Sequence, residues 1–473
     1  MKFNLIAAGG LAFAVIVSAP VIADNPQIDF GEYRDHLLQA HSKQLFGIKG
    51  ALDASSTESV DISTAEADPL SLVTLAQSLH AKAVSAEPDL AANIDMIVPW
   101  PGQRPTHLIV CNEQGTDEPS VQRVRRSDGF VETILTGMST CDPVRSTSWG
   151  TVIVAEEAGN SGSLLEIIHP LATTDVVYHR DTGALDGTDA GNVALRRAVG
   201  HLSFEGIALF PNGVMYYGDE NRPSSGTAGG AYFKFVPATP WTGGPPISNL
   251  DESPLISGSV FGLRLGLRSG GTDYGQGSNT GLGTWVEVLN ADDADLRAAS
   301  ATLKLTGYYR PEDADIDRKS LAHGDVRFCA NNTGNEGDDK NWGETICITD
   351  GSLIEATANT AIPEVQLFVT GTSQMAMTDN IAYQPGRGNW IMHEDGDAPG
   401  FAAPYNNDLW ACLEDGDDVD TLSDGCIRIA TLNDLNAEWT GGVFNSAGGH
   451  FFVSVQHNVT GHGVILDITG WKK

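Results

Sequence analysis

The chain has 473 residues, of which 61 are acidic and 28 basic, so its formal net charge is −33 at pH 7. So negative a surface excludes nucleic acid and anionic membranes as ordinary partners, and it repels an anionic substrate unless bound cations reverse the sign locally. The 53 glycines and 7 % aromatic residues are typical of a turn-rich β protein, and an all-β propeller can reach this length as one unit.

The chain begins with an export signal. Lys2 precedes an apolar run over residues 5–17, and a small-residue cleavage site ends at Ala23. These are the three regions of a secretory signal peptide, which we assign to residues 1–23. No other run is long and apolar enough to span a membrane, so we expect an exported protein, either periplasmic or extracellular.

Residues 24–100 differ in pattern from the rest of the chain. A helical pattern covers residues 33–45, a Ser/Thr/Asp-rich linker covers 54–68, and a second apolar helical stretch covers 70–84. We interpret residues 24–100 as an N-terminal extension packed on the outside of a propeller domain that covers 101–473. Helix is then expected mainly before residue 100.

Strand patterns begin near residue 106 and lead to the first paired carboxylates. A strand over residues 151–155 ends in Glu156 and Glu157, beside a turn that contains glycine. Such a pair fits a solvated strand end, and it equally fits a site for a hard cation.

The stretch over residues 201–237 predicts a β-hairpin with acids at one end. Glu205 precedes a strand, a Pro-Asn-Gly turn follows at 211–213, and the second strand runs into Asp219 and Glu220. Alternating β-branched and aromatic residues on both sides of the turn favour a hairpin, which places these acids together. Carboxylates crowded in this way call for a cation.

Similar units recur over residues 309–329, 378–395 and 440–457. Each has a polar or small start, a short strand, a glycine-containing turn, a second apolar strand and a polar exit, with Glu205, Glu312 and Asn380 at matching starts. Repeated hairpins of this kind predict propeller blades, whose inner strands converge on a central channel. Further oxygen-rich strand ends that could bind calcium occur at 379–380, 394–395 and 407–408.

The six cysteines fall in three pairs of near neighbours. Fifteen connectivities are formally open, but pairing within one hairpin region predicts Cys329 with Cys347 and Cys412 with Cys426. The acidic segment 415–425 then becomes a disulfide-closed loop, with calcium as an option. His457 ends an apolar strand, and we interpret it as a packed, hydrogen-bonded histidine.

Five stretches in the same order resemble the PhoX-type alkaline phosphatases and the exported proteins related to them. They read WGTVIVAEE, FEGIALFPNGVMYYGDE, YYRPED, DNIAYQPGRGNWIMHED and TGGVFNSAGGHFFVSVQHN, and the resemblance covers roughly residues 111–471. It implies a six-bladed propeller that hydrolyses phosphomonoesters at a central site of iron and calcium ions.

The resemblance also implies roles for individual residues. Arg310 matches the family's phosphate-binding arginine and is the expected catalytic residue. With the oxygen-rich strand end at 379–380 included, the expected metal ligands are Glu156, Glu157, Glu205, Asp219, Glu220, Glu312, Asp379 and Asn380. The family places an iron-binding cysteine directly before the paired glutamates, where this chain has Ala155. Losing that soft ligand favours calcium over iron.

Three functions remain open. The first is an exported phosphomonoesterase that acts as a monomer on a small phosphorylated substrate, which Arg310 with Glu312 favours. The second is a calcium-stabilised propeller for binding or scaffolding, and the third is a lactonase-like calcium hydrolase; Ala155 favours both. In the simplest alternative, Arg310 forms a surface ion pair with Asp313 or Asp315.

Overall fold

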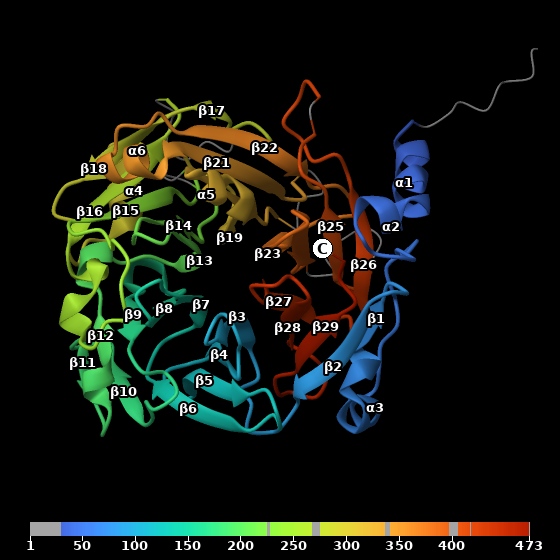
Figure 1. Ribbon diagram of the computed structural model, residues 1–473, viewed down its shortest axis with the longest axis horizontal. Helices are drawn as coiled ribbons and strands as arrows, with labels where there is room; N and C mark the ends of the chain where they lie inside the picture. The colour runs from blue at the N-terminus through green and yellow to red at the C-terminus, as the bar shows by residue number, and fades with distance from the viewer. Residues whose placement is uncertain are drawn as a thin grey trace, which may run out of the picture.

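Six β-sheets stand around a central axis as the blades of a propeller (Figure 1). The computed structural model describes residues 30–224, 228–266, 275–335, 341–396, 405–416 and 418–472. The all-β, six-bladed architecture expected from the sequence is confirmed. The signal peptide assigned to residues 1–23 lies outside the described residues.

The strands follow one another around the ring, apart from a few that join a blade from a distant part of the chain. Blade 1 contains β3 (Ile94–Trp100), β4 (His107–Asn112), β5 (Pro119–Arg125), β6 (Val131–Thr136), β10 (Val176–His179) and β11 (Ala184–Asp186), and blade 2 contains β7 (Cys141–Ser146), β8 (Val152–Glu156), β9 (Leu164–Ile167) and β12 (Val193–Leu195). Blade 3 contains β13 (Phe204–Leu209), β14 (Met215–Asp219), β15 (Tyr232–Pro237), β16 (Gly258–Arg264) and β18 (Thr284–Val288), and blade 4 contains β19 (Pro311–Ile316), β20 (Asp325–Asn332), β21 (Glu344–Ser352), β22 (Glu364–Thr370) and β17 (Gly281–Leu282). Blade 5 contains β23 (Thr378–Tyr383), β24 (Trp390–Glu394), β25 (Asp408–Cys412), β26 (Cys426–Leu432) and β1 (Val73–Leu75), and blade 6 contains β27 (Glu438–Phe444), β28 (His450–Gln456), β29 (Ile465–Thr469) and β2 (His80–Ser85).

The first strands of the six blades form an inner ring. Each of β3, β7, β13, β19, β23 and β27 contacts the inner strands of both neighbouring blades. Their labels surround the axis in Figure 1. Pairing within the blades is antiparallel, with the exception of β10 on β6. Residues at matching positions of the inner strands therefore meet around the channel.

The predicted hairpin of blade 3 has the expected turn. Gly213 adopts a φ of 93°, which an L side chain rarely takes, and the Asn212 side chain accepts a hydrogen bond from the Val214 N–H. The flanking residues alternate between two apolar layers. Tyr216, for example, stacks on Phe328 of blade 4 with ring centroids 4.6 Å apart. Apolar side chains buried between neighbouring blades thus pack the sheets face to face around the axis.

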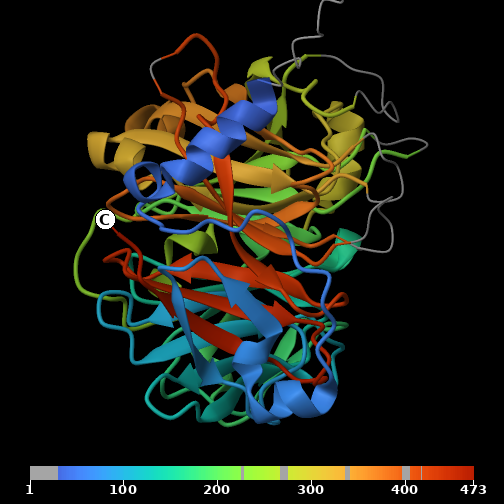
Figure 2. The same ribbon diagram turned by 90° about the vertical axis from the view of Figure 1, so that its right-hand side faces the viewer.

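The N-terminal strands close the ring (Figure 2). β1 pairs with β26 at the outer edge of blade 5, and β2 pairs with β29 at the outer edge of blade 6. The helix expected over residues 70–84 is therefore wrong, and only Pro69–Leu72 forms a 3-10 turn there. The backbone N–H and C=O groups at the free edges of β26 and β29 can pair with residues 73–75 and 80–85. This pairing outweighs the weak amphipathic helical pattern of residues 70–84. The sheets consequently begin at Val73, before the boundary expected at residue 101.

Helices are short and lie outside the blades. α1 (Phe30–Ala40) and α2 (Ser42–Leu45) match the helical pattern at 33–45, and α3 (Ile62–Ala67) follows in the stretch read as a linker. The remaining helices are α4 (Leu296–Leu303), α5 (Arg318–His323) and α6 (Leu353–Ala358). Helix is thus not concentrated before residue 100, because the connection from blade 3 to blade 4 and two connections within blade 4 are long enough to form helices. No helix within the described ranges has the length and apolar character needed to cross a membrane.

Three disulfides link the near neighbours. Cys111 pairs with Cys141, Cys329 with Cys347, and Cys412 with Cys426, so no cysteine is free. Both predicted local pairs are confirmed. Disulfides of this kind are typical of chains that fold in an oxidising compartment.

Candidate metal centre

Every inner strand has a β-bulge near its first residues. The register shifts between the residue pairs 94/97, 141/144, 204/207, 311/314, 378/381 and 440/443. A bulge inserts an unpaired residue and re-aims its side chain. The first bulge residues are Asp95, Asp142, Glu205, Glu312, Asp379 and Gly441, so five of six blades present a carboxylate at the same height of the channel.

These carboxylates line a cavity of about 330 Å³ at one end of the channel, which we call the acid cavity. Nine acidic residues line it: Asp95, Glu113, Asp142, Glu157, Glu205, Glu312, Asp379, Asp395 and Glu438. Within the described parts of the chain, Arg310 contributes the one guanidinium that lines it. The acids of the bulges are well shielded from water, since Asp142 and Glu312 are each only 2 % exposed.

A second ring of groups comes from the ends of the second strands. Glu113, Glu157, Asp395 and His457 each follow directly after β4, β8, β24 and β28 and line the acid cavity. Successive side chains of a strand point to opposite faces. The residue before each of them is not among the cavity's lining residues, whereas the residue itself is.

The structure brings together most of the residues expected from the sequence. Glu157, Glu205, Glu312, Asp379 and Arg310 all line the acid cavity.

Two further predicted residues lie beside the acid cavity. Glu220 reaches Arg310 from the end of β14, with 2.9 Å between Oε1 and Nε. Asn380 lies beneath the cavity, and its side-chain amide donates to Asp95 at 3.4 Å. Their roles as ligands remain predictions.

Glu156 and Asp219 do not join the cavity, which corrects the expectation that they converge there. Glu156 Oε1 lies 2.7 Å from Arg180 Nε, and Glu156 also accepts from two backbone N–H groups. Both carboxylate oxygens of Asp219 accept hydrogen bonds from the Arg297 guanidinium at 2.6–3.0 Å. Successive side chains of a strand point to opposite faces, and this alternation turns Glu156 and Asp219 away from the cavity.

Four acids of the cavity were not predicted from the sequence: Asp95, Glu113, Asp142 and Glu438. A usable signal exists, because Ile94-Asp95-Met96 and Cys141-Asp142-Pro143 repeat the pattern of a single acid between less polar residues at the start of an inner strand. His457 is not packed as expected. Its side chain is 48 % exposed at the cavity, and its Nε2 lies 3.0 Å from Glu438 Oε1.

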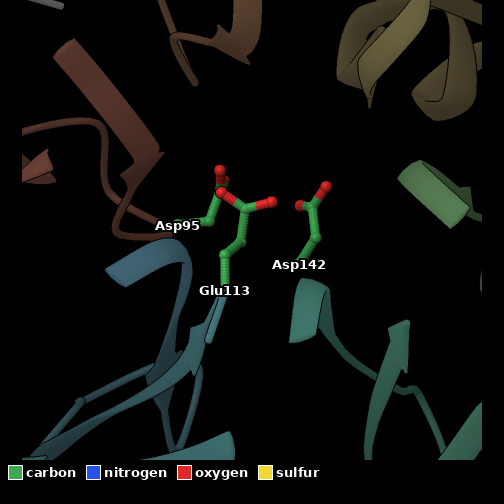
Figure 3. A group of neighbouring side chains, drawn as sticks. All are labelled: Asp95, Glu113 and Asp142. Atoms are coloured by element: carbon green, nitrogen blue, oxygen red, sulfur yellow. The ribbon is translucent and has the colours of Figure 1, made fainter. Parts of the chain in front are cut away.

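One corner of the acid cavity has the geometry of a cation site. Asp95, Glu113 and Asp142 each offer a carboxylate oxygen within 4.8 Å of the others, and all three point into one space (Figure 3). The buried Oδ1 atom of Asp142 has no hydrogen-bond partner. Oxygens about 2.3–2.6 Å from a shared Ca²⁺ would be spaced in this way, so the residues fit the ion.

The electrostatics of the cavity favour bound cations. Burial, reinforced by Glu113, raises the pKa of Glu157 to about 11. Burial raises the pKa of Asp142 to about 8, and it raises the pKa values of Glu205 and Glu312 well above their usual range. Without cations, Glu157 and Asp142 hold protons at neutral pH, whereas a bound metal ion would let them ionise.

Arg310 enters this cavity from a strained backbone position. Its φ is 58°, its N–H donates to Asn221 O, and its carbonyl accepts from the Thr333 N–H. A non-glycine residue held in this region stores of order 1–3 kcal/mol, and such strain clusters at functional sites. Arg310 contacts neither of the partners considered from sequence.

Acidic neighbours keep Arg310 charged. Its Nε lies 2.9 Å from Glu220 and 3.1 Å from Glu312. Burial opposes the charge, but the carboxylates of Glu312 and Asp395 outweigh it and raise the pKa of Arg310 well above the usual range. Its Nη2 is 4.0 Å from Asp395 Oδ2, which is too far for a hydrogen bond.

Two predicted features lie outside the acid cavity. Ala155 is fully buried in the apolar cluster beside Phe204 and is not among the cavity's lining residues. The loop between Cys412 and Cys426 brings the carboxylates of Asp415, Asp418 and Asp420 within 4.8 Å of one another at the surface of blade 5.

Comparison with known proteins identifies the fold. No family model and no curated protein matches the sequence. Among solved structures, Pseudomonas fluorescens PhoX in complex with vanadate, a transition state analogue, matches with a TM-score of 0.58 and 13 % identity, over 89 % of this chain and 98 % of that one. The chain shares its fold with PhoX.

Two further solved structures match with lower TM-scores. PQQ-bound aldose sugar dehydrogenase from Streptomyces coelicolor has a TM-score of 0.42 with 12 % identity, covering 84 % of this chain and 99 % of that chain. A gluconolactonase from Xanthomonas campestris has a TM-score of 0.42 with 11 % identity, covering 89 % and 96 %. At 13 % identity, the match to PhoX shows a common fold and not a common activity.

Proposed function

We propose that the chain is an exported, calcium-dependent phosphomonoesterase whose metal centre is the acid cavity. The observation that carries the proposal is the convergence of nine carboxylates and one guanidinium on a single cavity of about 330 Å³. Nine like charges in so small a space are stable only when protonated or bound to cations. A phosphomonoester carries the negative charge that a cation-filled site of this kind attracts.

Hard cations fit the available ligands. Every proposed ligand offers oxygen, and all six cysteines are in disulfides, so no thiolate is available to hold iron in the manner of the PhoX family. Asp95, Glu113 and Asp142 would hold one ion, and Glu157, Glu205, Glu312 and Asp379 can hold others. When bound, the ions neutralise the phosphoryl oxygens and polarise the attacking water.

Arg310 would bind the phosphoryl group. A guanidinium presents parallel N–H donors that match two phosphate oxygens, and no lysine can do this equally well. Glu312 and Glu220 orient the side chain through its Nε. PhoX, which shares this fold, binds vanadate, a transition state analogue, and a phosphoryl ligand of this chain would be an oxyanion of the same kind.

The test compares two arginines that each contact carboxylates. Wild-type protein purified without chelator should contain calcium by elemental analysis and should hydrolyse p-nitrophenyl phosphate. Arg310→Lys should lower kcat/KM by about 100-fold with unchanged calcium content, because one transition-state donor pair is lost. Arg196→Lys, at an arginine that contacts Glu166 away from the cavity, serves as the control and should leave kcat/KM within about threefold.

A second variant addresses the metal. Glu205→Gln should lose calcium and activity together, since it removes a bulge carboxylate. Unchanged calcium content and turnover in this variant would show that the proposed centre is wrong.

One observation favours a lactonase-like calcium hydrolase as the second candidate. Asn407 and Asn436 line the cavity beside the carboxylates, and the His457–Glu438 pair at its rim could take a proton from water. An aldonolactone assayed in parallel with the phosphomonoester separates the two activities. Protein that binds calcium and hydrolyses neither substrate would be a binding or scaffold propeller.

A further inference from the structure

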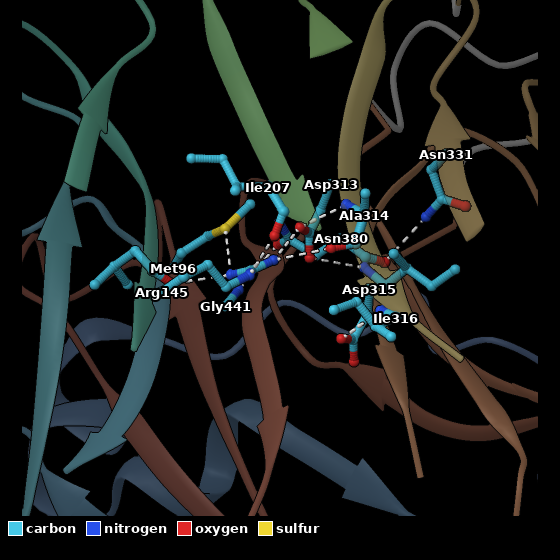
Figure 4. A network of polar contacts seen from close by, with 12 residues as sticks. Met96, Arg145, Ile207, Asp313, Ala314, Asp315, Ile316, Asn331, Asn380 and Gly441 are labelled. Carbon is cyan, nitrogen blue, oxygen red and sulfur yellow. Dashed lines mark hydrogen bonds and ion pairs between the residues drawn. The ribbon is translucent and has the colours of Figure 1, made fainter. Parts of the chain in front are cut away.

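Beneath the acid cavity, Arg145 of β7 makes a polar network across the channel (Figure 4). Its Nε donates to the Ile207 carbonyl at 2.9 Å, and its Nη1 donates to the Val144 carbonyl at 3.0 Å and to the Met96 sulfur at 3.2 Å. Its Nη2 donates to Asp313 Oδ1 at 2.5 Å and to the Ala314 carbonyl at 3.1 Å. All five N–H groups of the guanidinium thus have acceptors.

The contacts of Arg145 join the inner strands of four blades. Met96 lies on β3, Arg145 itself on β7, Ile207 on β13, and Asp313 on β19. Because no donor is left over, Arg145 is not available to bind a ligand. Its role is to hold these strands at fixed positions around the axis.

The network continues into the remaining two blades. The second oxygen of Asp313 accepts from the Ile381 N–H on β23 at 3.3 Å. On the same strand, Asn380 accepts from the Gly441 N–H of β27 at 2.9 Å and donates to Asp95 on β3 at 3.4 Å. The circle of inner strands is therefore closed by side-chain hydrogen bonds at one level.

This level lies between two cavities. The acid cavity is on one side, and a second cavity of about 370 Å³, lined by Arg145, Asp313 and Gly441 among others, is on the other. Three network residues directly follow acids of the cavity in the same bulge: Met96 follows Asp95, Asp313 follows Glu312, and Asn380 follows Asp379.

We propose that Arg145 is the positioning residue of the metal centre: by holding the bulges of the inner strands, it sets the distances between the carboxylates above it. The proposal rests on the metal centre described under the proposed function. Mutual repulsion drives ionised carboxylates apart, so a cation site needs a frame that keeps them at coordinating distance. Outer partners of metal ligands have this function in metalloproteins, and their loss typically weakens metal binding 10- to 100-fold.

The experiment measures cation binding by the full chain. Ca²⁺ affinity is determined by calorimetry, and the number of waters on bound Tb³⁺ is determined from luminescence lifetimes. Arg145→Lys keeps the charge but has three donors instead of five, and Arg145→Met keeps volume alone. Both should bind Ca²⁺ about 10- to 100-fold more weakly, with the lysine variant less affected, and bound Tb³⁺ should carry more water.

A buried arginine outside the network provides the control. Arg196 contacts Glu166 at 2.6 Å and the Leu250 carbonyl at 2.9 Å, away from the channel. Arg196→Lys should lower the unfolding midpoint without changing Ca²⁺ affinity or Tb³⁺ hydration. If the Arg145 variants do not fold, Asp313→Asn removes the charge of the partner with little change in shape and should weaken Ca²⁺ binding about tenfold.

The outcomes separate this proposal from the proposed function. A folded Arg145→Lys or Asp313→Asn variant with wild-type Ca²⁺ affinity and Tb³⁺ hydration overturns the positioning role. Wild-type protein that binds Ca²⁺ but hydrolyses no phosphomonoester overturns the phosphatase proposal alone. The ratio of Ca²⁺ affinities between wild-type protein and the Arg145 variants then still decides the role of Arg145. Wild-type protein that binds neither ion overturns both.

Discussion

Removal of cations should make the stability of this protein depend steeply on pH. Burial raises the pKa of Asp142 from 3.8 to about 8, so between these values the folded state keeps a proton that the unfolded chain has released. The stability that this proton contributes is complete below pH 3.8 and is lost as the pH rises through about 8. The metal-free protein should therefore be more stable at pH 5 than at pH 7.

The size of the effect follows from the linkage between proton binding and folding. Each raised carboxyl removes about 1.4 kcal/mol of stability per pH unit within its window, so Asp142 alone accounts for about 3 kcal/mol between pH 5 and pH 7. The pKa of Glu157 rises from 4.5 to about 11, which gives the same slope over this range. Bound Ca²⁺ should abolish the slope, because the ligands are then ionised in the folded state.

The assay is urea unfolding at pH 5, 6 and 7, with chelator and with excess Ca²⁺. Asp142→Asn should reduce the slope of the metal-free protein by about 1.4 kcal/mol per pH unit. Asp181→Asn, at an exposed aspartate, should leave the slope unchanged. Equal stability of the metal-free protein at pH 5 and pH 7, or a slope that persists in Ca²⁺, would refute the reasoning.

Two further predictions concern the packing of the propeller. Lys234→Met should destabilise the protein by about 3–5 kcal/mol in urea unfolding. The Lys234 ammonium lies 2.6 Å from the buried Asp350, which would be left without a counter-charge. A loss of stability below about 1 kcal/mol would contradict this reasoning. Gly206→Ala should destabilise the protein by about 1–3 kcal/mol, since a Cβ there overlaps the backbone of Asp313 on the neighbouring inner strand; wild-type stability would show that the strands can separate freely.

The sequence predicted those parts of the site that depend on local pattern. Glu205 and Glu312 begin strands in recognisable hairpins, and both line the cavity. Asp95 and Asp142 carry the same local signal but stand in weaker hairpin patterns, the first within a stretch read as an extension. Their equivalence to Glu205 and Glu312 is evident only from the bulge that all six inner strands share.

The choice between adjacent acids could not be made from the sequence. Glu156 and Glu157 are neighbours on one chain, yet Glu156 is held by Arg180 and Glu157 faces the cavity. The side-chain period of a strand is two, so a shift of one residue in register exchanges their faces. Register is fixed by packing against the neighbouring blades and not by the residues themselves.

The sequence by itself determined the all-β architecture, the local disulfides and the acidic ends of the hairpins, because each depends on residues close together in the chain. The tertiary structure decided how the ring closes, which acids meet, and what holds them. β1 and β2 pair with strands more than 350 residues away, and Arg145 reaches Asp313 across 168 residues. Such contacts leave no local pattern, because they arise only when six blades close into a ring and bring equivalent positions of distant strands to one axis.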